Sequence, residues 1–248
     1  MRLDVYLTEK GICKSRTAAQ SLIKSGGVLV GGKVCEKPSA DVGGDDIEVV
    51  GEQLRYVGRG GLKLEKALEV FGVKLDGALC IDIGASTGGF TDCMLQNGAA
   101  KVFAVDVGRD QLDKKLRCDS RVVSLEQTDI RSFDLEKYGI NGADFIGADV
   151  SFISLKMIFP HIRRLLRAGG TACVLIKPQF EAGQSLCADR SALNKKGIVR
   201  DEKIRLKIVD EIKRSAEENG LTVLGTAESP IKGGDGNTEY LLGLRREA

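Results

Sequence analysis

From Leu62 onward, short apolar runs alternate with amphipathic stretches. The strand-like runs lie at 79–84, 102–106, 122–125, 144–149, 172–177, 222–227 and 240–244, and the clearest helical stretches lie at 89–97, 155–167 and 201–219. Because parallel strands need crossover helices that cover both faces of a sheet, this alternation predicts an α/β fold with a mostly parallel, seven-stranded sheet. The last two runs have no helix between them, which predicts an antiparallel last strand.

The first 53 residues follow a different pattern. Residues 2–10 can form a short helix, and Ser15 is a plausible N-cap for a second helix that ends before Gly26. Two short apolar segments around Gly31-Gly32 predict a tight hairpin, and 47–50 predicts one more strand. We therefore expect a small α+β domain at the N-terminus.

The length of 248 residues fits two domains. Three glycines in 54–61 predict a linker, which divides the chain into 1–53 and 62–248. The longest apolar run is far shorter than the ~20 residues that span a bilayer, and the first residues lack a secretory signal. Seven scattered cysteines, no C-x-x-C pair and a single histidine favour reduced thiols, a cytoplasmic location and no structural zinc.

Charge is segregated within the N-terminal domain. Six basic residues and one acid lie in 10–37, whereas 38–54 holds five acids and no base. Such clustering predicts a local anion-binding surface that the net charge of +2 conceals.

A small-residue turn at 82–90 (D-I-G-A-S-T-G-G-F) carries the sharpest chemical signal. It follows an apolar strand and opens a helix, so the backbone can approach a ligand beside a helix N-terminus. Asp106 ends the second strand, where a carboxylate can accept both ribose hydroxyls of a nucleoside cofactor. Asp129 follows the third strand and either contacts the adenine or caps a helix.

The sequence D-I-G-A-S-T-G-G-F at 82–90 resembles the first motif of S-adenosylmethionine methyltransferases, especially the FtsJ-like RNA ribose methyltransferases. The resemblance implies a Rossmann-like methyltransferase domain with S-adenosyl-L-methionine as cofactor. The cofactor-binding candidates are Asp82, Gly84, Ala85, Ser86, Thr87, Gly88, Gly89, Phe90, Asp106, Asp129 and Asp149.

Four charged residues are similar in order to the catalytic tetrad of the same family: Lys63, Asp149, Lys177 and Glu239. The alternative is that all four are surface charges. Lys177 favours the tetrad because it follows the most apolar strand. A ribose hydroxyl must lose its proton as it attacks a methyl donor, and a lysine accepts a proton only when neutral. The sequence leaves open whether Lys177 is the base or orients the hydroxyl.

The N-terminal domain resembles the RNA-binding domain first seen in a small-subunit ribosomal protein and shared by pseudouridine synthases. The match is most specific from Lys14-Ser15-Arg16 to Gly32-Lys33. The candidate RNA contacts are Arg2, Lys14, Ser15, Arg16, Lys24 and Lys33, with Arg59 from the expected linker.

The two domains in this order, with R-Y-V-G-R-G-G-L-K-L, D-V-S-F-I-S-L and K-P-Q-F-E, resemble the TlyA family of rRNA 2′-O-methyltransferases, historically called hemolysins. The resemblance implies a cytidine ribose of ribosomal RNA as target. Because little precedes Arg2 and little follows the last strand, we expect large-subunit rRNA rather than both rRNAs. Two alternatives stay open: an inactive rRNA-binding protein and a membrane-lytic protein.

Overall fold

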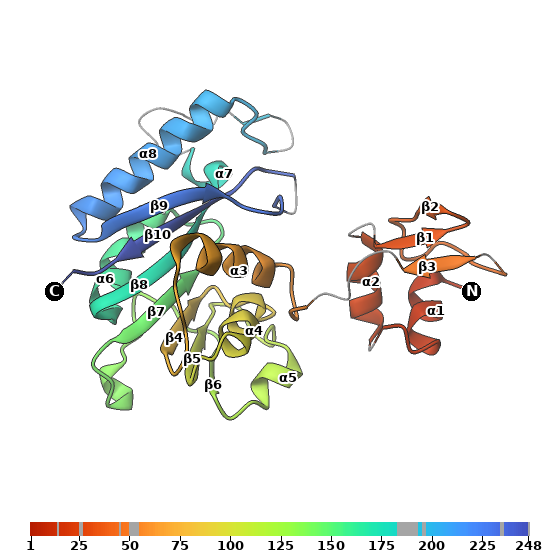
Figure 1. Ribbon diagram of the computed structural model, residues 1–248, viewed down its shortest axis with the longest axis horizontal. Helices are drawn as coiled ribbons and strands as arrows, with labels where there is room; N and C mark the ends of the chain where they lie inside the picture. The colour runs from red at the N-terminus through yellow and green to blue at the C-terminus, as the bar shows by residue number, and fades with distance from the viewer. Residues whose placement is uncertain are drawn as a thin grey trace. The chain divides into compact units, whose positions relative to one another are not determined.

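The structure is a computed structural model that describes residues 1–13, 15–24, 27–44, 46–49, 55–182, 193–194, 197–233 and 236–247. The chain divides into two compact units, Met1–Arg55 and Tyr56–Ala248 (Figure 1). We describe each unit by itself.

The first unit is the expected α+β domain. Helices α1 (Leu3–Glu9) and α2 (Arg16–Lys24) accompany an antiparallel sheet with the order β2-β1-β3, formed by Lys33–Val34, Val28–Val30 and Ile47–Val49. Its small core is built from fully buried aliphatic side chains, among them Leu3, Leu7 and Ile23. Burial of these side chains against the sheet stabilises the short helices, which would be marginal alone.

The second unit holds the expected seven-stranded sheet, in the order β6-β5-β4-β7-β8-β10-β9. The strands are β4 (Leu79–Ile83), β5 (Lys101–Val105), β6 (Val122–Leu125), β7 (Ala143–Ala148), β8 (Leu166–Ile176), β9 (Thr222–Glu228) and β10 (Tyr240–Arg245). Strands β4 to β8 pair in parallel, and β10 is antiparallel to both β8 and β9. The prediction of a mostly parallel sheet with an antiparallel last strand is confirmed.

Helices cover both faces of this sheet (Figure 1). The helical segments are α3 (Gly60–Phe71), α4 (Gly89–Gln96), α5 (Lys114–Arg117), η1 (Glu136–Tyr138), η2 (Leu155–Met157), α6 (Phe159–Leu165), α7 (Pro178–Glu181) and α8 (Glu202–Glu218). Alternate residues of one strand pack on opposite sides, since Cys80 joins the core under α3 and α4 whereas Ile81 joins the core under α6 and α8.

The single helix expected at 155–167 is two shorter segments. Pro160 lies in the first turn of α6, where its missing N–H costs nothing, so α6 is separated from the 3₁₀ turn η2. Strand β8 then begins at Leu166, earlier than the apolar run at 172–176 indicates, because Leu166 pairs with Ala143 of β7.

Residues 56–61, expected within a linker, belong to the second unit. Tyr56 is only 2% exposed, and α3 begins at Gly60. A Cβ atom on Gly61 would lie 2.3 Å from the ring of Tyr56, so this glycine permits close packing rather than flexibility. The glycines that predicted a hinge therefore fix this segment against α4, where Gly89 lies beside Gly61.

Candidate active site

Asp82, near the end of β4, supports the turn that follows this strand. Its carboxylate is fully buried and accepts hydrogen bonds from the backbone N–H (2.8 Å) and the hydroxyl (2.7 Å) of Thr91, in the first turns of α4. Gly84 has φ +80°, and a Cβ there would lie 2.7 Å from the carbonyl oxygen of Asp149. The turn therefore packs directly on the chain that follows β7.

Asp82 itself does not line the pocket described below. Burial raises its pKa to about 7, because a charged carboxylate loses hydration there; the hydrogen bonds from Thr91 oppose the shift. The structure thus gives Asp82 a supporting position under the turn rather than a place among the groups that face a ligand.

The buried Asp82 should make stability fall as pH rises. The carboxyl has a pKa of ~3.9 in an unfolded chain, so between that value and about 7 the folded protein retains a proton that the unfolded chain has released. The free energy of unfolding should therefore decrease with pH in this window, by at most about 1.4 kcal/mol per unit. Denaturant unfolding at pH 5 to 8 should show a weaker dependence for Asp82→Asn; an equal slope in both proteins would contradict this.

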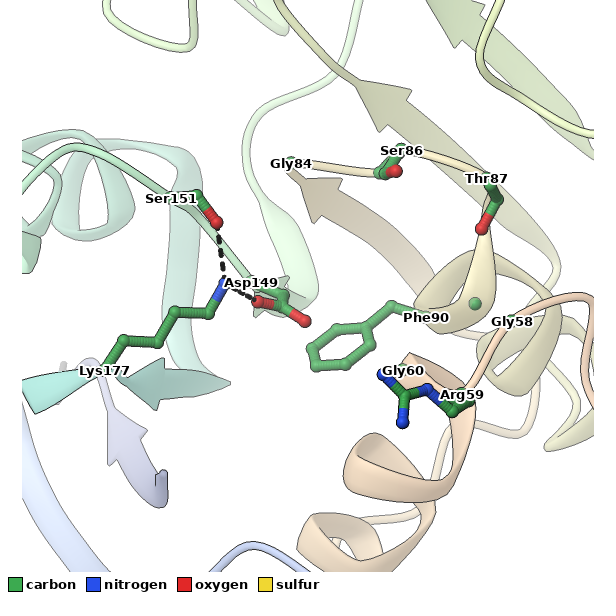
Figure 2. A pocket seen from close by; sticks show the side chains of 12 residues that line it. Gly58, Arg59, Gly60, Gly84, Ser86, Thr87, Phe90, Asp149, Ser151 and Lys177 are labelled. Carbon is green, nitrogen blue, oxygen red and sulfur yellow. Dashed lines mark hydrogen bonds and ion pairs between the residues drawn. The ribbon is translucent and has the colours of Figure 1, made fainter. Parts of the chain in front are cut away.

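A cleft of about 220 Å³ opens above the turn (Figure 2). Its lining comes from four parts of the second unit: residues 58–60 at the start of α3, the turn after β4 with the start of α4, the chain after β7, and the residue after β8. The lining residues are Gly58, Arg59, Gly60, Gly84, Ala85, Ser86, Thr87, Gly89, Phe90, Asp149, Ser151 and Lys177. Most of the predicted glycine-rich turn is therefore brought to one cavity, and Gly88 lies between two of its lining residues.

The four tetrad candidates form one continuous chain of contacts. Lys177 Nζ lies 2.6 Å from Asp149 Oδ1, and Lys63 Nζ lies 3.4 Å from Asp149 Oδ2 and 2.8 Å from Glu239 Oε2. All four side chains are at most 19% exposed. Two cations and two carboxylates thus compensate each other's charge, as buried charges require.

Each tetrad member has a distinct place in the fold. Asp149 follows β7, Lys177 follows β8 and Glu239 precedes β10, as expected from the sequence. Lys63 lies in α3, a helix that the hydrophobic pattern did not predict. Asp149 and Lys177 line the cleft, whereas Lys63 and Glu239 lie behind them.

Ser151 is a member of the site that the sequence did not predict. Lys177 Nζ donates a hydrogen bond of 2.9 Å to Ser151 Oγ, and both side chains face the cleft (Figure 2). The only signal for Ser151 was its place in the D-V-S-F string that begins at Asp149. Lys177 is therefore held by an anion on one side and a hydroxyl on the other.

Asp106 and Asp129 differ in their surroundings. The two carboxylate oxygens of Asp106 accept hydrogen bonds of 2.7 Å from the N–H groups of Ser86 and Gly108. Ser86 lines the cleft, whereas Asp106, like Asp82, is not one of its lining residues. Asp129 instead pairs with Arg131 at 2.6 Å and accepts a hydrogen bond from its backbone N–H within a turn. No helix begins at this turn of the described chain, so the helix-cap alternative is not seen there either. Its contact with an adenine stays a prediction.

In the first unit, Arg2, Ser15 and Arg16 lie at or near the starts of α1 and α2. Ser15 Oγ accepts a hydrogen bond from the N–H of Ala18, so the predicted N-cap is present. Lys33 is exposed on β2. Lys14 and the side chain of Lys24 lie outside the described part of the chain.

Arg59 does not belong to this unit. It is exposed at the edge of the cleft in the second unit (Figure 2). Its predicted contact with RNA would therefore be made at the cleft that contains Lys177.

Within the described residues, no group of three or more His, Cys, Asp or Glu side chains is arranged to hold a metal ion. The described helices also include none that is long and apolar enough to cross a membrane.

The fold and the cleft define the class of protein. A family model described as FtsJ-like methyltransferase matches residues 56–246, and one described as S4 domain matches residues 1–47. These limits follow the two units closely.

Comparison with individual proteins shows to which group of FtsJ-like methyltransferases the chain is most similar. The chain is 46% identical to the Bacillus subtilis protein named "Putative rRNA methyltransferase YqxC", over 98% of this chain and 85% of that protein. It is 39% identical to the Mycobacterium tuberculosis 16S/23S rRNA (cytidine-2′-O)-methyltransferase TlyA, over 99% and 90%. A solved structure titled "Putative hemolysin from Streptococcus thermophilus" superposes with a TM-score of 0.78 at 43% identity, covering 100% of this chain and 88% of that one. The chain belongs to the TlyA family of FtsJ-like methyltransferases.

Proposed function

We propose that this protein transfers a methyl group from S-adenosyl-L-methionine to the ribose 2′-hydroxyl of a cytidine in ribosomal RNA. The observation that carries the proposal is the buried chain Lys177–Asp149–Lys63–Glu239 at a cleft built by the glycine-rich turn. Charged side chains at a surface are rarely buried, whereas Lys63, Lys177 and Glu239 are. The names of the relatives supply the substrate class.

The residues at the cleft suit a nucleoside cofactor. Backbone N–H groups of the turn and of the start of α4 are free of bulky side chains from Gly84 to Gly89, which lets an amino-acid or ribose group approach. Asp106 presents acceptor oxygens next to Ser86. When bound, S-adenosyl-L-methionine supplies an electrophilic methyl group on a sulfonium.

Replacing Asp106 with alanine should weaken cofactor affinity by roughly tenfold or more, because hydrogen bonds to a charged group are among the stronger ones. Asp210→Ala is the matched control, since Asp210 is exposed on α8 and pairs with Lys213 outside the cleft; Asp129→Ala tests the predicted adenine contact separately. Titration calorimetry with S-adenosyl-L-methionine would measure all three. Equal affinity in wild type and Asp106→Ala would remove Asp106 from the site, and a large loss in Asp129→Ala would place Asp129 in it.

Lys177 is the residue that would meet the ribose hydroxyl. Two of its contacts are taken by Asp149 and Ser151, which fixes the amino group and leaves one position directed at a third partner. As the new carbon–oxygen bond formed and the carbon–sulfur bond of the donor broke, the hydroxyl proton would pass to Lys177 Nζ while Lys177 gave one of its own protons to Asp149 Oδ1. Asp149 would then carry the proton, and the sulfonium would leave as a neutral thioether. At 2.6 Å, Lys177 Nζ and Asp149 Oδ1 are close enough for a proton to pass directly between them.

RNA recognition is assigned to the S4 unit, with its exposed Arg2, Arg16 and Lys33, and to Arg59 at the cleft. Cations on a phosphate backbone give affinity and register, whereas the cleft selects the reacting ribose. The expected substrate is large-subunit rRNA, and the expected location of the protein is the cytoplasm.

Mapping ribose methylation in rRNA from cells with and without this protein tests the proposal. One cytidine in large-subunit rRNA should lose its methyl group when the protein is absent and regain it with purified protein and labelled methyl donor. Unchanged rRNA and no transfer of label would support the inactive rRNA-binding alternative. Leakage of lipid vesicles caused by the protein would support the membrane-lytic one.

A further inference from the structure

The S4 unit contains one carboxylate that is fully buried beneath its basic residues. Asp4, in the first turn of α1, has a side chain that is 0% exposed. It accepts hydrogen bonds from Arg2 Nε and Nη2 (3.0 Å each), from Arg16 Nε (3.0 Å) and from Gln20 Nε2 (2.7 Å). Four donors from α2 and the residue preceding α1 therefore converge on one anion.

The contact with Asp4 uses only some of the hydrogen-bond donors of Arg2 and Arg16. A guanidinium has five N–H donors. Arg16 gives only its Nε–H to Asp4, and Arg2 gives Nε–H and one N–H of Nη2. The side chains are 48% (Arg2) and 55% (Arg16) exposed. Asp4 thus uses one edge of each guanidinium group, and the partial exposure of both side chains leaves room for other partners at the remaining donors.

The carboxylate is kept ionised by these contacts. The hydrogen bond from Arg2, followed by those from Gln20 and Arg16, holds the pKa of Asp4 far below its ordinary value despite burial. The pair of arginines and the single carboxylate leave one net positive charge. That charge is spread over two planar groups whose orientation is fixed, the geometry that suits bidentate contacts to phosphate.

We propose that Asp4 is a positioning residue for RNA: it orients Arg2 and Arg16 so that their outer edges contact phosphates of the RNA backbone. This inference rests on the proposed function, because it concerns the rRNA that the S4 unit would bind. A long arginine side chain that is already ordered loses less conformational freedom on binding. The negative charge of Asp4 therefore supports the binding of another anion.

The direction in which Asp4→Asn changes the affinity for RNA distinguishes a positioning role from an effect of charge alone. If charge alone mattered, Asp4→Asn would strengthen binding, because it removes a negative charge from a basic surface. If positioning matters, Asp4→Asn weakens binding to an rRNA fragment, by roughly tenfold near physiological salt. Glu36→Gln is the matched control: it removes the same charge from an exposed residue between Lys33 and Lys37. This control should bind as tightly as wild type or slightly more tightly.

A double-mutant cycle tests the link to Arg16. In the wild-type background, Arg16→Ala should weaken RNA binding. In the Asp4→Asn background it should have little further effect, because Arg16 is already displaced. Additive losses, or affinity of Asp4→Asn equal to or above wild type, would overturn the proposal.

Asp4→Asn leaves a buried amide in place of a charge, so its folding is checked by thermal unfolding. Arg16→Lys provides a second variant that leaves the Asp4 side chain itself unchanged and removes one of its donors. It keeps the positive charge but lacks the Nε–H and the planar fork, so it should bind several-fold more weakly with a nearly unchanged salt dependence. Wild-type affinity of Arg16→Lys would overturn the proposal even if Asp4→Asn fails to fold.

Binding and transfer are measured separately in the full chain. Asp4→Asn should raise the KM for rRNA and leave kcat at saturating rRNA near wild type. If wild type transfers no methyl group to the rRNA it binds, the proposed function fails, and the affinities of the variants still decide the role of Asp4.

Discussion

Replacing Lys177 with alanine should lower the single-turnover rate of methyl transfer by ~10²–10⁴-fold, the range for a positioned acid–base group. Lys177 contacts both Asp149 and Ser151 at the cleft, and it lies at the end of the buried strand β8. Its contact with the hydroxyl strengthens mainly in the transition state, so affinities for cofactor and rRNA should change little. Rapid quench of enzyme with bound rRNA and labelled cofactor measures the rate.

Two further variants sharpen this test. Lys177→Arg should not restore the rate, because a guanidinium stays protonated and has a different shape. Lys66→Ala is the matched control, since Lys66 lies on α3 like Lys63, but its side chain is 41% exposed and pairs with Glu69. A near-wild-type rate in Lys177→Ala would show that the hydroxyl proton leaves by another route, through Asp149 or water.

A chain that begins at Tyr56 should bind rRNA weakly but retain cofactor affinity. It lacks all the basic candidates of the S4 unit, each of which contributes roughly 0.7 to 0.9 to the slope of log K against log salt if it contacts a phosphate. Loss of five such contacts would flatten the slope by about 3.5 to 4.5. Binding measured from low to high salt, beside calorimetry with cofactor, tests both expectations.

The position of the truncation is itself informative. A chain that begins at Leu62, the boundary expected from the sequence, also lacks Gly58, Arg59 and Gly60, which line the cleft. This shorter chain should lose cofactor affinity as well, and it also loses Tyr56 from the core under α3. Equal cofactor affinity in the two truncated chains would mean that the segment 56–61 takes no part in the site. An unchanged salt slope in either would place the rRNA contacts elsewhere.

The sheet was predictable because its central strands are buried on both faces. Continuous apolar runs such as 172–176 and the intervening amphipathic stretches follow directly from that burial. Helix α3 escapes prediction, although Leu64, Ala67 and Leu68 carry a helical apolar spacing, because the glycines before it are also typical of a linker. Packing of Tyr56 on Gly61 is a tertiary contact, and no local pattern indicates it.

The candidate site was predictable to a different degree. Acidic and basic residues at the carboxyl ends of β7 and β8 meet because parallel strands present those ends at one edge. The contact of Lys63 with Glu239 depends on the antiparallel entry of β10, and the role of Ser151 depends on the rotamer of Lys177. A carboxylate beside a glycine turn, such as Asp82, either faces a ligand or supports the turn, and the sequence does not distinguish these positions.

The contact between Lys63 and Glu239 joins residues 176 positions apart in the chain. Closing so long a loop costs conformational entropy. Contacts made by β10 offset this cost only when β10 has paired with β8 and β9. Lys63 therefore gains the carboxylate that holds it beside Asp149 only in a molecule whose sheet is complete as far as β10. The charged chain of the site depends on this last strand as much as on the glycine-rich turn.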